Sequence, residues 1–172
     1  ALRVRPEEIY FTSGGTESNN LALLGYAHHL RGKAHMLVNP SEHSSVHEVF
    51  LELNRRGHQV EFLENDASGR VTPEILERHM RPDTALVSVM HVNNESGAVN
   101  DVETLAALAK RINPGCMFHS DGVQAFLKVP VPSFREIDAY SISGHKFHGP
   151  RGSGVCYLKK GAFVQQILYG GS

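Results

Sequence analysis

The sequence predicts an α/β fold, a mostly parallel sheet with helices on both faces. Short apolar runs alternate with longer amphipathic runs along the whole chain, which is typical of βαβ units. No repeat, low-complexity tract or Pro/Gly-rich linker divides the 172 residues, so one domain accounts for them. Polar clusters directly follow the apolar runs, as expected where strand ends carry a ligand site.

The first βα unit lies at the start of the chain. An apolar run at 8–11 predicts a strand, and the motif SGGTE follows it. Leu21, Leu24 and Ala27 then recur at helical spacing and predict a helix over 18–30.

The middle of the chain repeats this arrangement. We predict a strand at 35–39 and a helix near 45–56, which Gly57 ends because glycine is preferred after a helix C-terminus. A strand near 59–63 follows. Thr72-Pro73 then predicts the start of another helix, because Thr is preferred at the N-cap and Pro at the first helical position.

The last elements are mainly strands. The run 84–90 is continuously apolar at its centre, as in a strand covered on both faces. Asp101 begins a helix that extends to about Ile112. Further strands are predicted at 116–119, reaching Asp121, and at 139–142 and 154–158.

Composition excludes several classes of protein. Lys+Arg 17 against Asp+Glu 18 gives a net charge of -1, so the basic footprint of a nucleic-acid or anionic-membrane binder is missing. No apolar run approaches the ~18 residues of a membrane span, and the start lacks a signal-peptide pattern. We expect a soluble cytoplasmic protein in which Cys116 and Cys156 are inert core thiols.

Five polar clusters follow candidate strands: SGGTE, SEHSS, HVNNE, HSDGVQ and SGHKFHG. Because the carboxyl ends of parallel strands meet at one edge of a sheet, we expect these clusters to form one site.

Two residues of these clusters suggest a chemistry. Lys146 is flanked by His145 and His148 just past an apolar strand, where burial and nearby positive charge would favour its neutral amine. A neutral lysine can condense with an aldehyde, and Asp121 at a neighbouring strand end can pair with a ring nitrogen. Pyridoxal phosphate enzymes need both groups. Singly, a solvated lysine and an aspartate turn cap remain common alternatives.

The phosphate of that cofactor has a candidate site at SGGTE, where two glycines and Thr16 precede a helix whose free N–H groups favour an anion. The same motif is also an ordinary capping box with a turn. Further candidates are Ser143 and His145 for the phosphate, His43 for stacking on the ring, and Gln124 and Asn94 for its phenolic oxygen.

Two other patterns in the sequence bear on function. GPRGSG at 149–154 precedes a strand instead of joining a strand to a helix, so it is not a dinucleotide loop. The histidine-rich composition leaves open a function of another class, a metal-dependent hydrolase using His43, His47, His119 or Asp121. The order HxxxHE differs from the HExxH of zinc peptidases, and we assign no metal ligand.

Five motifs occur in order over about residues 8 to 171: YFTSGGTESNN, SEH, LVSVMHVNNESG, FHSDGVQA and SISGHKFHGPRGSG. Together they resemble the cysteine desulfurases and selenocysteine lyases of the class V aminotransferase group. The resemblance implies the large domain of the fold type I pyridoxal phosphate transferases and a homodimer. It also implies conversion of L-cysteine to L-alanine, with sulfur passed to an enzyme cysteine as a persulfide for iron-sulfur cluster or other sulfur biosynthesis.

The resemblance also implies a role for each candidate. Lys146 would hold pyridoxal phosphate covalently, Asp121 would pair with the pyridine nitrogen and His43 would stack on the ring, so these three are the expected catalytic residues. The other expected contacts are Gln124 to the phenolic oxygen, Thr16, Ser143 and His145 to the phosphate, and Asn94 near the ring oxygen and the substrate carboxylate.

The chain departs from the family pattern in two ways. It reads Asp121-Gly122-Val123-Gln124 where the family commonly has DAAQ, a change that should leave the chemistry intact. We also expect residues 1–172 to be the large domain alone, without an N-terminal segment and without the small domain that carries the persulfide cysteine and the substrate-carboxylate arginine. The isolated chain is then expected to be inactive.

Alternatives within this resemblance stay open. A selenocysteine lyase or another class V aminotransferase fits the same motifs, and a sulfur-acceptor protein is a candidate partner. A third view is that the isolated chain only binds cofactor or a partner.

Overall fold

A computed structural model describes residues 2–170 and contains one seven-stranded sheet, in the order β1-β7-β6-β5-β4-β2-β3. The strands are β1 (Ile9–Thr12), β2 (His35–Val38), β3 (Gln59–Phe62), β4 (Thr84–Ser88), β5 (Met117–Asp121), β6 (Ala139–Ser143) and β7 (Gly154–Leu158). The helices are η1 (Pro6–Glu8), α1 (Gly15–His29), α2 (Ser44–Arg55), α3 (Pro73–His79), α4 (Val102–Ile112) and η2 (Gly144–Phe147).

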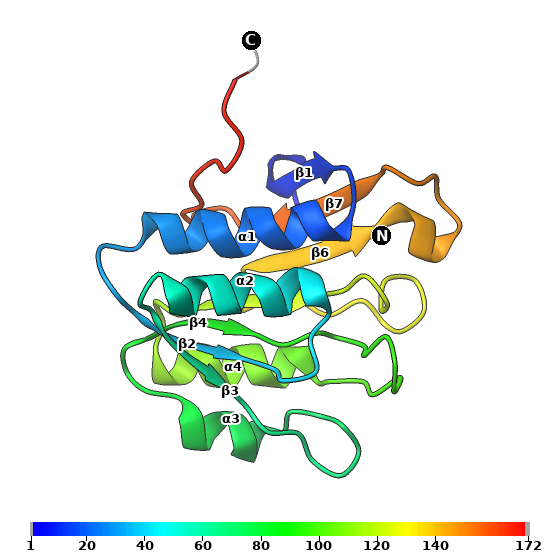
Figure 1. Cartoon of the computed structure of the whole chain (residues 1–172). Coiled ribbons are helices and arrows are strands. Elements are labelled where there is room, and N and C mark those ends of the chain that lie inside the picture. The colour runs from blue at the N-terminus through cyan, green and yellow to red at the C-terminus, as the bar shows by residue number, and fades with distance from the viewer. Residues whose placement is uncertain (1, 171–172) are drawn as a thin grey trace.

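The helices lie in two layers, one on each face of the sheet. α1 and α2 run side by side across one face (Figure 1), where Leu23 and Phe50 pack with Met36. α3 and α4 cover the other face, where Leu76 and Leu105 are fully buried. The predicted α/β class with helices on both faces is therefore confirmed.

The strand directions bring the polar loops together. β2 pairs in parallel with β3 and β4, and β4, β5 and β6 continue the parallel ladder. β7 runs antiparallel to both of its neighbours, so β1 points the same way as β6. Six strands therefore end at one edge of the sheet. The segment GPRGSG leads into β7, as predicted.

The local signals set most element boundaries. Thr72 caps α3 by accepting a hydrogen bond from the Ile75 N–H, and Gly57 follows α2 with φ of 92°, a conformation that glycine adopts without strain. α1 begins three residues earlier than predicted. Glu17 folds back there and its carboxylate accepts from the N–H and hydroxyl of Ser13.

β4 ends at Ser88, two residues earlier than the predicted strand. Beyond Ser88, side chains and not a neighbouring strand pair with the backbone N–H and C=O of Met90. The Glu42 carboxylate accepts from the Met90 N–H, and the Asn100 amide donates to the Met90 carbonyl. The loop after β4 is therefore held by specific side chains.

The two cysteines lie in the core, as predicted. Burial raises the pKa of both Cys116 and Cys156 to about 12, so each stays a neutral thiol. Within residues 2–170 no helix combines the length and apolar character that a bilayer crossing requires.

Candidate functional site

The predicted site residues come together in one cavity of about 420 Å³ at the carboxyl ends of the strands. That volume is typical of small-molecule sites. The cavity is lined by all eight candidates, Thr16, His43, Asn94, Asp121, Gln124, Ser143, His145 and Lys146. A larger hollow of about 1000 Å³ beside Arg3 and Phe134 contains none of them, so the smaller cavity is the candidate site.

Asp121 is the buried acid of this cavity. It is the last residue of β5, and its two carboxylate oxygens accept from the Val123 N–H at 2.9 Å and the Asn19 amide at 2.8 Å. Burial raises the pKa of Asp121, while these hydrogen bonds and the charges of His43 and Lys146 oppose the rise. The carboxylate is thus placed to pair with a cationic or N–H group of a ligand.

His43 stands at the N-terminus of α2 with an exposed ring. Its Nδ1 atom accepts from the Ser45 N–H at 3.1 Å and lies 2.9 Å from the Ser45 hydroxyl. The imidazole therefore caps the helix and lines the cavity at the same time, a position from which an aromatic ligand could be covered.

The N-terminus of α1 forms another wall. N–H groups in the first turn of a helix lack intrahelical partners, and Gly15 and Thr16 of that turn line the cavity. A Cβ at Gly15 would meet Val123 Cγ2 at 2.7 Å, so a larger residue there would require Val123 to move. The Ser143 hydroxyl lies 3.0 Å from His145 Nδ1 on the same side. The combination suits an anionic group such as a phosphate.

Lys146 differs from the expectation in its environment. Burial was expected to favour its neutral amine, but the side chain is exposed at the cavity rim. The physical reason is local, because β6 ends at Ser143 and the short turn η2 carries Lys146 beyond the end of the sheet. The predicted desolvation of Lys146 is therefore wrong for this chain, although its place in the cavity agrees with the prediction.

Gln124 and Asn94 lie at the margin of the cavity. The Gln124 side-chain oxygen accepts from Lys128 Nζ at 2.8 Å, so its amide N–H groups are the ones that can face a ligand. Asn94 is exposed on the loop after β4.

The structure explains why glycine occupies position 122 between Asp121 and Val123. A Cβ at Gly122 would overlap the ring of Tyr140, a buried residue of β6. The Tyr140 hydroxyl lies 2.8 Å from His91 Nδ1. The tyrosine thus fills the space that an alanine side chain would need.

The geometry does not favour the metal-hydrolase alternative. His119 is fully buried between the hydroxyls of Ser88 and Ser141, and burial lowers its pKa to about 3. His47 packs instead against the Phe62 ring at 5.0 Å. Over the described part of the chain, no group of three or more His, Cys, Asp and Glu residues is arranged to hold a metal ion.

Three polar residues at the site escaped the sequence interpretation: Asn19, Ser45 and Glu42. Asn19 lies on the buried stripe of α1 with Ala22 and Leu23, whereas Leu21 and Leu24, which marked the helix in the sequence, are only partly buried, so the periodicity gave no signal for it. Ser45 and Glu42 carried none, since polar residues near a helix N-terminus are usually caps or solvated.

Comparison with known proteins gives the relatives of this chain. A family profile described as aminotransferase class-V matches residues 2–172. The cysteine desulfurase IscS of Shewanella baltica (strain OS223) is 45% identical over 156 residues, which cover 89% of this chain and 38% of that protein. The cysteine desulfurase IscS of Dictyoglomus turgidum is 40% identical over 174 residues, covering all of this chain and 44% of the relative.

Solved structures show the same relationship. A NifS-like protein superposes with a TM-score of 0.94 at 38% identity, over 99% of this chain and 47% of that chain. DndA from Streptomyces lividans gives 0.91 at 39% identity, over 99% and 49%. The chain therefore spans about half the length, or less, of the proteins it matches.

Proposed function

The chain belongs to the class V aminotransferase family, and from that premise we propose that its cavity binds pyridoxal phosphate within a cysteine desulfurase. The observation that carries the proposal is the convergence of eight side chains from five loops on one cavity. The residues fit the cofactor at both ends. Asp121 is a buried carboxylate suited to a pyridine N–H, and the wall of Gly15, Thr16, Ser143 and His145 suits a phosphate.

When bound, pyridoxal phosphate supplies an electron sink for the pair released at the α-carbon of an amino acid. Asp121 would accept a hydrogen bond from the ring nitrogen and so favour the protonated ring. His43 would cover the ring face and keep water from it. Lys146 would bind the aldehyde through Nζ and, when free, would carry a proton to and from the α-carbon at the rim.

The proposed substrate is L-cysteine, because the matched relatives are named cysteine desulfurases and the solved structure of SspA, 35% identical with a TM-score of 0.90, is described as a complex with cysteine. We propose L-alanine as product and transfer of sulfur to a cysteine thiolate. Cys116 and Cys156 are unsuited to that role, because both are buried with a raised pKa.

The remaining parts of the proposal concern the whole protein. We propose that residues 1–172 are its cofactor-binding large domain, that it works as a homodimer, and that its sulfur supplies iron-sulfur cluster or other sulfur biosynthesis. Selenocysteine as substrate is the alternative within the family, and comparison of alanine formation from the two amino acids by the whole protein decides between them.

Titration of the purified chain with pyridoxal phosphate tests the central claim. The wild-type chain is expected to develop a visible absorption band from a covalent adduct with a lysine. Lys146→Ala should lack this band, whereas Lys160→Ala, a change at an exposed lysine outside the cavity, should retain it. Identical spectra for wild type and Lys146→Ala would refute the lysine assignment.

A further inference from the structure

A chain of hydrogen bonds joins Asp121 to His43 below the cavity. The side-chain nitrogen of Asn19 lies 2.8 Å from Asp121 Oδ2 and 2.8 Å from the Ser45 hydroxyl oxygen. That hydroxyl lies 2.9 Å from His43 Nδ1. The link passes between β5, α1 and α2, and it connects residues 102 positions apart in the sequence.

The direction of each hydrogen bond follows from the groups involved. An ionised carboxylate only accepts, so the Asn19 amide nitrogen donates one hydrogen to Asp121 and its second to Ser45 Oγ. The Ser45 hydroxyl then turns its own hydrogen to His43 Nδ1, which also accepts from the Ser45 backbone N–H at 3.1 Å. Nδ1 thus faces two donors, and a neutral His43 carries its hydrogen on Nε2.

The burial of Asn19 indicates that the two N–H groups of its amide are the reason for a polar side chain at this position. The side chain is 0% exposed, and its oxygen is buried without a partner among the described residues. An unpaired buried acceptor costs free energy, and an apolar side chain of the same shape would avoid that cost. The two N–H donors of the Asn19 amide, and not its oxygen, therefore account for an amide at this buried position.

We propose that Asn19 is a positioning residue that orients the Asp121 carboxylate directly and the His43 ring through Ser45. Its consequence for catalysis rests on the proposed function, since these are the groups assigned to the ring nitrogen and the ring face. The hydrogen-bond link itself does not depend on a cofactor. One side chain of α1 thereby orients two residues, Asp121 and His43, that lie at or beyond the ends of different strands.

The link predicts a definite response to substitution. Burial raises the pKa of Asp121, and the Asn19 hydrogen bond opposes that rise. Removing the donor should raise the pKa of Asp121 further and release the Ser45 hydroxyl from its partner. Asn19→Leu keeps the shape and removes both donors. Ser45→Ala removes only the half of the link that leads to His43.

The first experiment uses the cofactor-free chain. NMR of the histidine ring nitrogens reports the tautomer of His43, and the carboxyl carbon signal of Asp121 reports its titration. Wild type should have hydrogen on His43 Nε2. Asn19→Leu should shift the ring signals and move the Asp121 titration to higher pH, whereas Ser45→Ala should shift only the ring signals. Asn20→Leu is the matched control, because the Asn20 amide donates to the Thr16 carbonyl within α1.

The second experiment measures pyridoxal phosphate affinity. A hydrogen bond to a charged group contributes enough that its loss should weaken binding about tenfold in Asn19→Leu. Ser45→Ala should weaken binding less, and Asn20→Leu should bind like wild type. If wild type itself does not bind pyridoxal phosphate, the proposed function fails, while the NMR measurement still decides the link.

The proposal is overturned if folded Asn19→Leu leaves both the His43 and the Asp121 signals unchanged. Circular dichroism establishes whether that variant folds. If it does not fold, Ser45→Ala decides, since unchanged His43 ring signals in that variant would also overturn the link and shifted signals would support it.

Discussion

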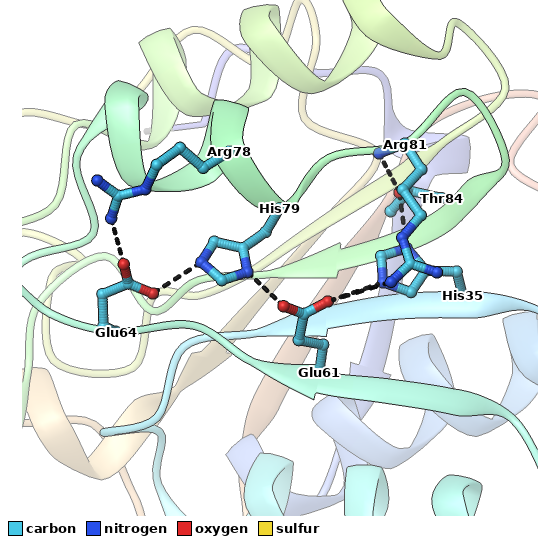
Figure 2. A network of polar contacts seen from close by, with 7 residues as sticks. All are labelled: His35, Glu61, Glu64, Arg78, His79, Arg81 and Thr84. Carbon is cyan, nitrogen blue, oxygen red and sulfur yellow. Dashed lines mark hydrogen bonds and ion pairs between the residues drawn. The ribbon is translucent and has the colours of Figure 1, made fainter.

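Two clusters of histidine and carboxylate lie at different places in the fold and behave in opposite ways. The cavity cluster consists of His43, Asp121 and Lys146, which line the cavity, and of Glu42, which is buried near Asp121. The edge cluster consists of His35, Glu61, Glu64 and His79, between β2, the edge strand β3 and α3 (Figure 2). Both combine histidine with carboxylates, and they differ in whether these side chains satisfy one another.

The edge cluster is paired within itself. His79 lies between the two carboxylates, with Nδ1 on Glu61 and Nε2 2.7 Å from Glu64. Glu61 also meets His35 Nε2 at 3.2 Å, and Arg78 pairs with Glu64 (Figure 2). Burial opposes the change, but hydrogen bonds from His79 and His35 leave the pKa of Glu61 lowered. This cluster holds α3 on β3.

In the cavity cluster burial raises the pKa of both carboxyl groups, and Glu42 is the less well compensated of the two. Burial raises the pKa of Glu42 well above its usual range, and the nearby Asp121 adds to the effect. One Glu42 oxygen accepts from the Met90 N–H, and the other is buried without a partner among the described residues. Buried acids whose desolvation is incompletely compensated destabilise a fold, so two of them at or next to a cavity point to a ligand.

The two clusters differ in the way that separates structural from functional histidines and acids. In the edge cluster, charged side chains that pair with one another stabilise the packing of α3 on β3. Buried charges with raised pKa beside an open cavity indicate a site that is completed by something it binds. The following changes test that distinction.

The largest expected effect is on cofactor affinity. Asp121→Asn keeps the size of the side chain and removes the charge assigned to the ring nitrogen. Truncating one partner of a buried charged pair costs ~2 kcal/mol or more, so pyridoxal phosphate should bind at least about 30-fold more weakly. Visible titration measures this. A variant that binds like wild type would contradict the role of Asp121.

Glu42→Gln should stabilise the protein. Because burial raises the pKa of folded Glu42 above its unfolded value of about 4.3, the native state holds the proton more tightly, and stability falls as pH rises from that value toward the folded pKa. Glutamine avoids this loss and can still accept from the Met90 N–H.

The expected gain for Glu42→Gln is ~1–2 kcal/mol at about pH 8, and it shrinks as pH falls toward about 4. Urea unfolding of both proteins at several pH values measures the difference. A gain that did not depend on pH would show that ionisation of Glu42 is not its cause.

Much of this fold followed from local signals. The α3 cap at Thr72, the stop at Gly57 and the buried strands were read from neighbouring residues, because caps and hydrophobic periodicity act over a few positions. The gathering of the site residues also followed, since parallel strands must end at one edge.

Other features depend on contacts that no local pattern encodes. The exposure of Lys146 depends on what surrounds the turn after β6. The hydrogen bond from Asn19 to Asp121 spans 102 positions, and Tyr140 determines why Gly122 cannot be alanine. Such long-range pairs become visible only when the sheet order is known.

A smaller effect is expected in the edge cluster. Burial alone would lower the pKa of His79, but its hydrogen bonds to Glu61 and Glu64 raise it overall. Its contribution is therefore full below the ordinary value of about 6.5 and is lost as pH rises through the folded pKa. Glutamine has N–H donors but cannot take up a proton, so the pH-dependent part of this contribution is lost.

His79→Gln should lower stability by ~0.5–1 kcal/mol at about pH 6 and by less at about pH 9, after allowance for the partly exposed partners. Urea unfolding at both values measures this. His47→Gln is the control, because that ring packs against Phe62. An equal loss at both pH values would refute the ion-pair assignment.

The smallest effect is expected from Arg78→Ala. Arg78 pairs with Glu64 at the outer end of the edge cluster, where the two side chains are 62% and 49% exposed. Water and salt screen such a pair, and ordering two long side chains offsets its attraction. The urea midpoint should therefore match that of wild type at both low and high salt. A clear loss of stability that disappears in high salt would mean that the edge cluster acts as one network extending to Arg78. The exposed pair of Arg78 and Glu64 would then belong to the stabilising part of the cluster.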